Sequence, residues 1–164
     1  MTTRTPQLQV AAPPDLPYID TERVVDAPRD LVFRCWTEPD LLVQWLGPKR
    51  LTMRVEEFEA RDGGRYRYVH TDTDGSEYRF HGVFHGPVTV DNLVQTFEFE
   101  GAPGQVSLER LVLEDLGDGR TLMRGHSTYE SVEARNAMAA SGMETGMAEG
   151  YEQLDALLAR LQAS

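Results

Sequence analysis

Two polar residues fall where the strand pattern predicts an apolar face, and they are the first candidates for chemistry. Gln95 and Glu109 alternate with leucine and phenylalanine in two successive predicted strands. A buried polar group needs a hydrogen-bonding partner, and burial raises the pKa of a carboxyl group. The pair could orient the polar end of a ligand in an apolar pocket. Alternatively, both could bond to tyrosines of the same face, namely Tyr66, Tyr68 or Tyr151.

The histidines are the next candidates, because imidazole binds metals and transfers protons. His81 and His85 are four residues apart in a predicted strand, so they share one face. A metal site needs a third ligand and a supporting shell, and no cysteine or further histidine motif is near. We expect both to face solvent. His70 lies near a strand end and His126 on an outer face, and neither has a pattern typical of catalysis.

The other reactive groups are few. Cys35 follows Phe33 and precedes Trp36 in a predicted helix, and nothing beside it would lower the pKa of its thiol. We therefore predict a buried structural cysteine. The sequence has no Gly-x-Ser-x-Gly motif, no phosphate-binding loop and no dinucleotide fingerprint. We expect no catalytic residue, no metal and no cofactor.

The composition is that of one acidic domain. The chain has 164 residues, with 27 acidic and 16 basic side chains and a net charge of −11. Such a surface repels nucleic acid and anionic lipid, so neither is an expected partner. A single cysteine allows no internal disulfide, which fits a cytoplasmic location. We interpret residues 1–17, which are rich in proline, as a flexible arm, and residues 18–164 as the domain.

The elements that must position these residues follow from the hydrophobic period. One strand is predicted at residues 18–26 and two short helices at 31–37 and 40–45. From there the period is two, and turn residues separate six further strands, at residues 52–60, 65–70, 77–86, 93–100, 106–115 and 121–129. A short helix at 132–139 and a long one at 141–161 complete the chain. We therefore predict an α+β fold with a seven-stranded antiparallel sheet.

The long helix predicted at residues 141–161 has one apolar face. Its apolar stripe is formed by Met143, Met147, Tyr151, Leu154, Leu158 and Leu161. Ser141 and Glu144 have the spacing of a capping box, which would start the helix at Ser141. Gly146 and Gly150 lie beside the stripe, although each glycine costs about 1 kcal/mol in a helix. We expect a large partner, either the sheet or a ligand, close to that face.

The turn around Asp74-Gly75 sets the register of the sheet. A two-residue loop would place Tyr66 and Tyr68 on one face with histidines, whereas a three-residue loop with a left-handed Gly75 groups them with Phe80. The second choice separates apolar from charged side chains, so we adopt it. The same alternation points Phe97 inward on the next strand.

Several short motifs resemble a known family in their order and spacing. They are Glu22 to Pro28, Trp45-Leu46-Gly47-Pro48, Gly63-Gly64, Gly119-Arg120-Thr121 and Ser141 to Gly146. Together they are similar to Aha1-type START-like domains, the branch of the SRPBCC superfamily that includes activators of the Hsp90 ATPase. The resemblance implies a helix-grip fold, with an apolar cavity between the C-terminal helix and the sheet. It also implies a mostly bacterial family that binds hydrophobic small molecules.

Three functions are compatible with these observations. The first is binding of a hydrophobic or amphipathic small molecule, which we favour because no catalytic set is present. The second is a polyketide-cyclase-like reaction on an aromatic or polyketide substrate, for which Glu109 is the one acid–base candidate. The third is activation of an Hsp90-type ATPase. Exposed sheet edges also suggest a homodimer.

The predicted binding site combines the inward strand positions with the stripe of the long helix. Its members are Trp45, Tyr66, Tyr68, Phe80, Gln95, Phe97, Glu109, Met143, Met147 and Tyr151.

Overall fold

The computed structural model describes residues 7–163 and has the predicted α+β architecture. The elements in chain order are β1 (Gln9–Ala11), β2 (Tyr18–Val25), α1 (Arg29–Thr37), α2 (Pro39–Leu42), β3 (Thr52–Phe58), β4 (Arg65–Thr71), β5 (Glu77–Thr89), β6 (Asn92–Phe99), β7 (Val106–Asp115), β8 (Thr121–Thr128), α3 (Val132–Ala139) and α4 (Met143–Ala163).

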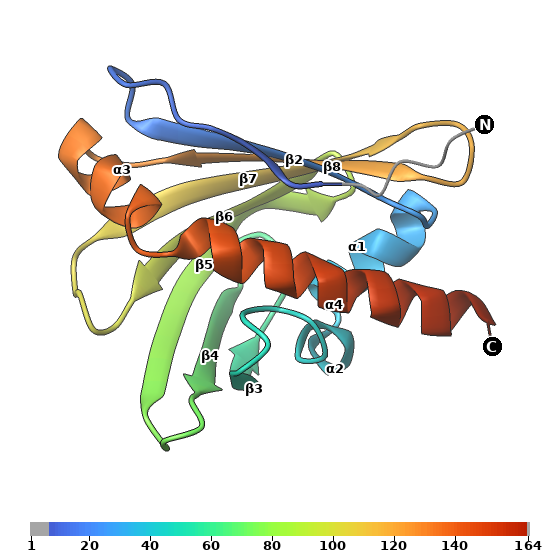
Figure 1. The fold of residues 1–164 in the computed structure, drawn as a ribbon, viewed down its shortest axis with the longest axis horizontal. Coiled ribbons are helices and arrows are strands. Elements are labelled where there is room, and N and C mark those ends of the chain that lie inside the picture. The colour runs from blue at the N-terminus through green and yellow to red at the C-terminus, as the bar shows by residue number, and fades with distance from the viewer. Residues whose placement is uncertain (1–6, 164) are drawn as a thin grey trace.

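One antiparallel sheet and one long helix make up most of the molecule. The strands lie in the order β1-β2-β8-β7-β6-β5-β4-β3. Strands β3 to β8 form a meander, and β2 pairs with its last strand, β8. The sheet curves, and α4 runs across its inner face (Figure 1). Helices α1 and α2 lie toward the C-terminal end of α4, and α3 lies beyond its N-terminal end.

The sheet has eight strands where the sequence predicted seven. The additional strand is β1, whose residues Gln9 and Ala11 pair with Glu22 and Asp20 of β2. This edge strand lies in the segment that we interpreted as an arm, and residues 1–6 of that segment lie outside the described part of the chain. Three residues paired on one side are too short to show a period of two, which is why the pattern missed them.

The strand predicted at residues 77–86 is longer than expected. Strand β5 continues to Thr89, and its pairing with β6 becomes irregular between His85 and Thr89. Gly86 has a φ of +74°, so it forms a bulge inside the strand. Gly86 therefore has the left-handed backbone conformation that is common in turns, but the turn between β5 and β6 lies a few residues later.

The predicted register of the β4–β5 hairpin is confirmed. Tyr66 lies opposite Gly82 and Tyr68 opposite Phe80, and Gly75 in the loop has a φ of +88°. The aromatic side chains of both strands therefore lie on the inner face.

The capping box predicted for the long helix is wrong. Helix α4 begins at Met143, and the Ser141 hydroxyl donates a hydrogen bond to the Met138 carbonyl oxygen at 2.6 Å. Ser141 thus satisfies the end of α3, and Gly142, with a φ of +87°, turns the chain into α4.

The two glycines of α4 differ in what they face. A Cβ atom on Gly150 would lie 3.2 Å from the backbone nitrogen of Gly47 and 3.2 Å from the carbonyl oxygen of Trp45. A Cβ atom on Gly146 would meet only Pro48, at 3.4 Å. The partner at Gly150 is therefore the backbone after α2, and not the sheet or a ligand as we expected.

Polar contacts hold α4 in this position. The Gln153 amide donates to the carbonyl oxygens of Trp45 and Gly47 at 3.2 and 2.9 Å. Buried Arg23 of β2 donates two hydrogen bonds to the Asp155 carboxylate, at 2.9 and 2.6 Å. The helix is thus tied both to the loop after α2 and to the sheet.

The edge strands carry features that limit pairing with other chains. Strand β3 is interrupted by a register shift between Val55 and Glu57, and it exposes Arg54 and Glu56. Bulges and charges of this kind discourage edge-to-edge association. A homodimer therefore stays a prediction, for which light scattering is the test. None of the helices within residues 7–163 is long and apolar enough to cross a membrane.

We predict opposite outcomes for alanine at the two helical glycines. Gly150→Ala should lower the free energy of unfolding by about 1–3 kcal/mol, because the new methyl group meets backbone atoms that cannot move aside. Gly146→Ala should raise it by up to about 1 kcal/mol through helix propensity. Urea denaturation of both variants measures this difference, and equal effects would contradict the close contact at Gly150.

Candidate functional site

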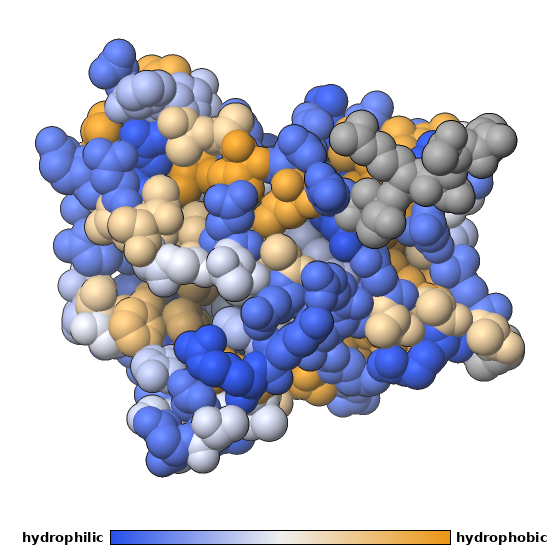
Figure 2. Space-filling model, viewed as in Figure 1, coloured by the Kyte–Doolittle hydropathy of each residue, from blue (hydrophilic) through white to orange (hydrophobic). Residues whose placement is uncertain are grey.

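A cavity of about 420 Å³ lies between α4 and the inner face of the sheet. Ligand-binding pockets typically measure roughly 300–1,000 Å³. Strands β4 to β8, the loop after α2, the end of α3 and the first half of α4 all contribute to its wall. Hydrophobic surface gathers above α4, toward β2 and β8, while the outward side of the helix is largely hydrophilic (Figure 2).

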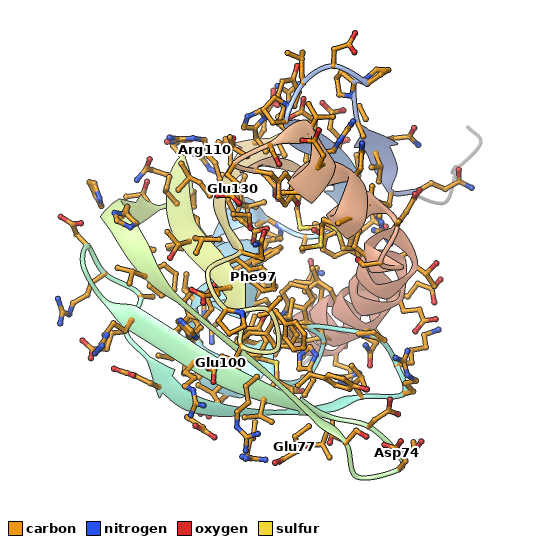
Figure 3. The ribbon with its side chains drawn as sticks, turned by 90° about the vertical axis from the view of Figure 1, so that its left-hand side faces the viewer. Asp74, Glu77, Phe97, Glu100, Arg110 and Glu130 are labelled. Atoms are coloured by element: carbon orange, nitrogen blue, oxygen red, sulfur yellow. The ribbon has the colours of Figure 1, made fainter. Side chains whose placement is uncertain are left out.

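The structure brings all of the predicted site residues together around this cavity. Trp45 comes from the loop after α2, Tyr66 and Tyr68 from β4, Phe80 from β5, Gln95 and Phe97 from β6, Glu109 from β7, and Met143, Met147 and Tyr151 from α4. Phe97 lies between the strands and α4, whereas Glu100 lies on the outside of the sheet (Figure 3). For the predicted site residues that come from strands, this common placement follows from the alternation of side chains along each strand. It requires the correct register between neighbouring strands.

Aromatic rings form most of the apolar wall. Trp45 stacks on Tyr151 with ring centroids 6.1 Å apart, and Trp36 meets Trp45 edge-on at 4.7 Å. On the sheet, Phe80 stacks between Tyr68 and Phe97, with centroids 5.3 Å apart in each pair. These contacts fix the shape of one wall, while the methionines of α4 supply adaptable side chains opposite.

Glu109 is the acidic side chain of the cavity, and its environment is apolar. Burial raises the pKa of its carboxyl group to about 7, and the Ser127 hydroxyl, donating at 3.2 Å, opposes this only in part. No basic side chain within residues 7–163 is close enough to lower this pKa. The carboxyl group therefore titrates near neutral pH.

The hydrogen-bonding partner of Glu109 differs from the tyrosines that we considered. Ser127 lies directly opposite Glu109 on β8, and Gln95 lies opposite it on β6. The Tyr66 hydroxyl donates to the carbonyl oxygen of Thr96 at 2.5 Å, and the side chain of Gln95 is also a hydrogen-bonding partner of Tyr66, as one of the two alternatives proposed. The polar end of the cavity is thus a row of three neighbouring strand positions, Gln95, Glu109 and Ser127.

His70 is a cavity residue that the sequence interpretation missed. It is 6% exposed, it lines the cavity, and its Nε2 atom has no hydrogen-bonding partner among the described residues. Burial lowers the pKa of its imidazole to about 4, so the ring is neutral at pH 7. The signal was available, because His70 continues the alternation of Tyr66 and Tyr68 along β4.

Other lining residues carried weaker signals. Tyr129 follows β8, and Met138 comes from α3 and borders the cavity at the start of α4. Trp36 of α1 also lines the cavity, and its indole nitrogen has no partner among the described residues. The positions of α1 and α3 relative to the sheet depend on tertiary packing, so periodicity could not place these side chains.

A second hollow, of about 540 Å³, lies on the outer face of the sheet, and Arg67, His81, Glu98 and Glu100 in its wall pair with one another. Arg67 donates two hydrogen bonds to Glu100, both at 2.8 Å, and this holds the pKa of Glu100 down to about 2. His81 contacts the same carboxylate at 3.1 Å. The predicted outward position of His81 is confirmed, and no group suited to binding a metal occurs in the described part of the chain. The smaller inner cavity is therefore the better candidate site.

A curved antiparallel sheet that wraps around a long C-terminal helix defines the helix-grip class of START-like, SRPBCC-type domains. The family model described as "Activator of Hsp90 ATPase homolog 1-like protein" matches residues 26–159. The chain belongs to this family, as the motifs from Glu22 to Gly146 indicated. No curated protein matches the sequence.

Solved structures agree with this assignment. A protein from Rhodobacter sphaeroides is 28% identical, with a TM-score of 0.86 over 94% of this chain and 99% of the other. A protein from Arthrobacter aurescens is 32% identical, with a TM-score of 0.84 over 93% and 91% of the two chains. The AHSA1 protein from Silicibacter pomeroyi, at 19% identity and a TM-score of 0.69 over 87% and 97%, shares the fold.

Glu109→Gln should change how stability depends on pH. The folded carboxyl group has a pKa of about 7, whereas an unfolded glutamate has one of roughly 4.3. Between these values the folded chain holds a proton that the unfolded chain has released, so stability falls as pH rises. We expect the stability of the variant relative to the parent to rise by roughly 1–3 kcal/mol between about pH 4 and pH 8.

Urea denaturation at several pH values measures this difference. The lowered pKa of His70 gives the opposite slope, with stability lost as pH falls, but His70 is present in both proteins and its contribution cancels. A difference between the two proteins that stays constant with pH would contradict the desolvation of the Glu109 carboxyl group in the folded chain.

Proposed function

We propose that this chain binds a hydrophobic or amphipathic small molecule in the cavity between α4 and the sheet. The observation that carries the proposal is the composition of the cavity wall. Aromatic and methionine side chains line a cavity of about 420 Å³. Three polar residues, Gln95, Glu109 and Ser127, lie side by side at one end of it. An apolar pocket with a few convergent polar groups is the usual form of a small-molecule site.

The same carboxyl group supports a second candidate function, acid–base catalysis on a bound aromatic or polyketide-like substrate. A general acid or base works best when its pKa is near the working pH, and burial raises the pKa of Glu109 to about 7. A substrate consumed by the parent protein but not by Glu109→Gln would favour catalysis. Recovery of the ligand unchanged from both proteins would favour binding alone.

Gly146→Leu tests whether the cavity is a binding site. Gly146 lines the cavity, and its Cβ position has ordinary contact with Pro48, so a leucine side chain can extend into the empty space. Titration with Nile red, a neutral apolar dye, should show binding by the parent and at least about tenfold weaker binding by the variant. Stability should change little, because the helix gains propensity while the cavity is filled.

Thr145→Leu is the matched control, since this neighbouring residue of α4 is exposed and does not line the cavity. It should bind the dye like the parent. Absence of dye binding by the parent, together with a loss of about 1–3 kcal/mol in Gly146→Leu, would show an ordinary packed core and reject the proposal.

A further inference from the structure

We infer that the ligand of the cavity carries a positive charge, as an apolar or aromatic amine whose ammonium group pairs with Glu109. This inference rests on the proposed binding function and adds the chemical class of the ligand. It follows from three features of the cavity: a carboxyl group without a charged partner among residues 7–163, the aromatic rings that line the same cavity, and the pairing of the bordering Arg110 with Asn92 rather than with Glu109.

The carboxyl group has no charged partner among residues 7–163. Among the described residues, its hydrogen bond comes from the neutral Ser127 hydroxyl, at 3.2 Å. Buried carboxylates are costly unless a cation or several donors compensate them. Elsewhere the protein supplies such compensation, as in the pair of Arg23 with Asp155 and that of Arg67 with Glu100. The carboxylate of Glu109 is therefore available to pair with the cationic group of a ligand.

The basic residue that borders the cavity does not neutralise Glu109. Arg110 is adjacent to Glu109 in β7, so its side chain points to the opposite face of the sheet. It is exposed, and its guanidinium donates to Asn92 at 3.2 Å. In Figure 3 it lies at the outside of the strands. His70, the other nitrogen-containing side chain of interest, is neutral at pH 7.

Four tyrosines from several elements, Tyr66, Tyr68, Tyr129 and Tyr151, line the same cavity as the carboxyl group. Burial raises the pKa of Tyr66, Tyr68 and Tyr151, and the charge of Glu109 raises each of them further. The same two causes raise the pKa of Tyr129 to about 12. All four rings therefore lie within electrostatic reach of Glu109. Aromatic faces attract cations, and a carboxylate among such faces is suited to an ammonium group.

The charge of the whole protein favours the same ligand class. The net charge of −11 attracts cations and repels anions, including ligands that carry a carboxylate. A neutral ligand could still accept a hydrogen bond from protonated Glu109, and a comparison of matched compounds separates the two cases.

Three naphthalene derivatives of similar shape provide this comparison: 1-naphthylmethylamine, 1-naphthalenemethanol and 1-naphthoate. Equilibrium dialysis against the full chain at near-neutral pH and moderate salt gives their affinities. We expect the amine to bind at least about tenfold more tightly than the alcohol, and the naphthoate to bind most weakly. Glu109→Gln should remove the preference for the amine and leave the affinity for the alcohol within about twofold.

Glu114→Gln is the control for overall charge, because it removes one exposed carboxylate from the same strand. It should retain the preference for the amine. Nile red binding by each variant confirms that the cavity is intact.

Equal binding of the amine and the alcohol, or an amine preference that survives in Glu109→Gln, would overturn the inference and leave the proposed binding function standing. Failure of the amine to bind would overturn the inference as well. Failure of all three compounds and of Nile red would overturn both.

Discussion

The close contact between Gly150 of α4 and the backbone at residues 45–47 is the constraint on which the cavity depends. It brings the middle of the helix against the loop after α2, and the hydrogen bonds of Gln153 hold that loop in place. One turn earlier, Gly146 meets only Pro48, and the helix lies over open space. The buried residues of the helix thus begin at Gly150, whereas Met143, Gly146 and Met147 before it line the cavity.

The sheet completes the cavity because its curvature turns the inner faces of β4 to β8 toward the same space. The register of each hairpin decides which side chains take part, since a slip of one residue would move Tyr66 and Tyr68 to the outside. The ion pair of Arg23 with Asp155 holds α4 to β2 at the far end. Helix position and sheet register are therefore both needed to enclose the site.

The two faces of the sheet shift the pKa of a glutamate in opposite directions. On the outer face, Arg67 and His81 contact Glu100, and the pKa of this carboxyl group falls to about 2. On the inner face, Glu109 has apolar neighbours and one hydroxyl donor, and its pKa rises to about 7. The difference arises from solvation and charge partners, because both residues are glutamates, one directly after β6 and the other in the neighbouring strand β7. A carboxyl group kept in the second state lowers stability at neutral pH, which is why we assign it a role in binding.

The class of fold, the register of the β4–β5 hairpin and the inward set of side chains could all be predicted from the order of residues alone. These features are local. The alternation of a strand, a turn that contains glycine and the apolar stripe of a helix can each be recognised within a short stretch of sequence. The same alternation contained His70, although the interpretation overlooked it.

Other features depend on how distant segments pack in three dimensions. The tertiary structure added β1 to the sheet, moved the start of α4 to Met143, and placed Trp36 and Met138 in the wall of the cavity. It also distinguished Gly150 from Gly146, which are equivalent in the helical pattern. Each of these outcomes depends on which distant segments pack together, and distances between such segments have no signature in the order of neighbouring residues. The pairing of Glu109 with Ser127, across 18 positions of sequence, and its isolation from every described basic group arise in the same way.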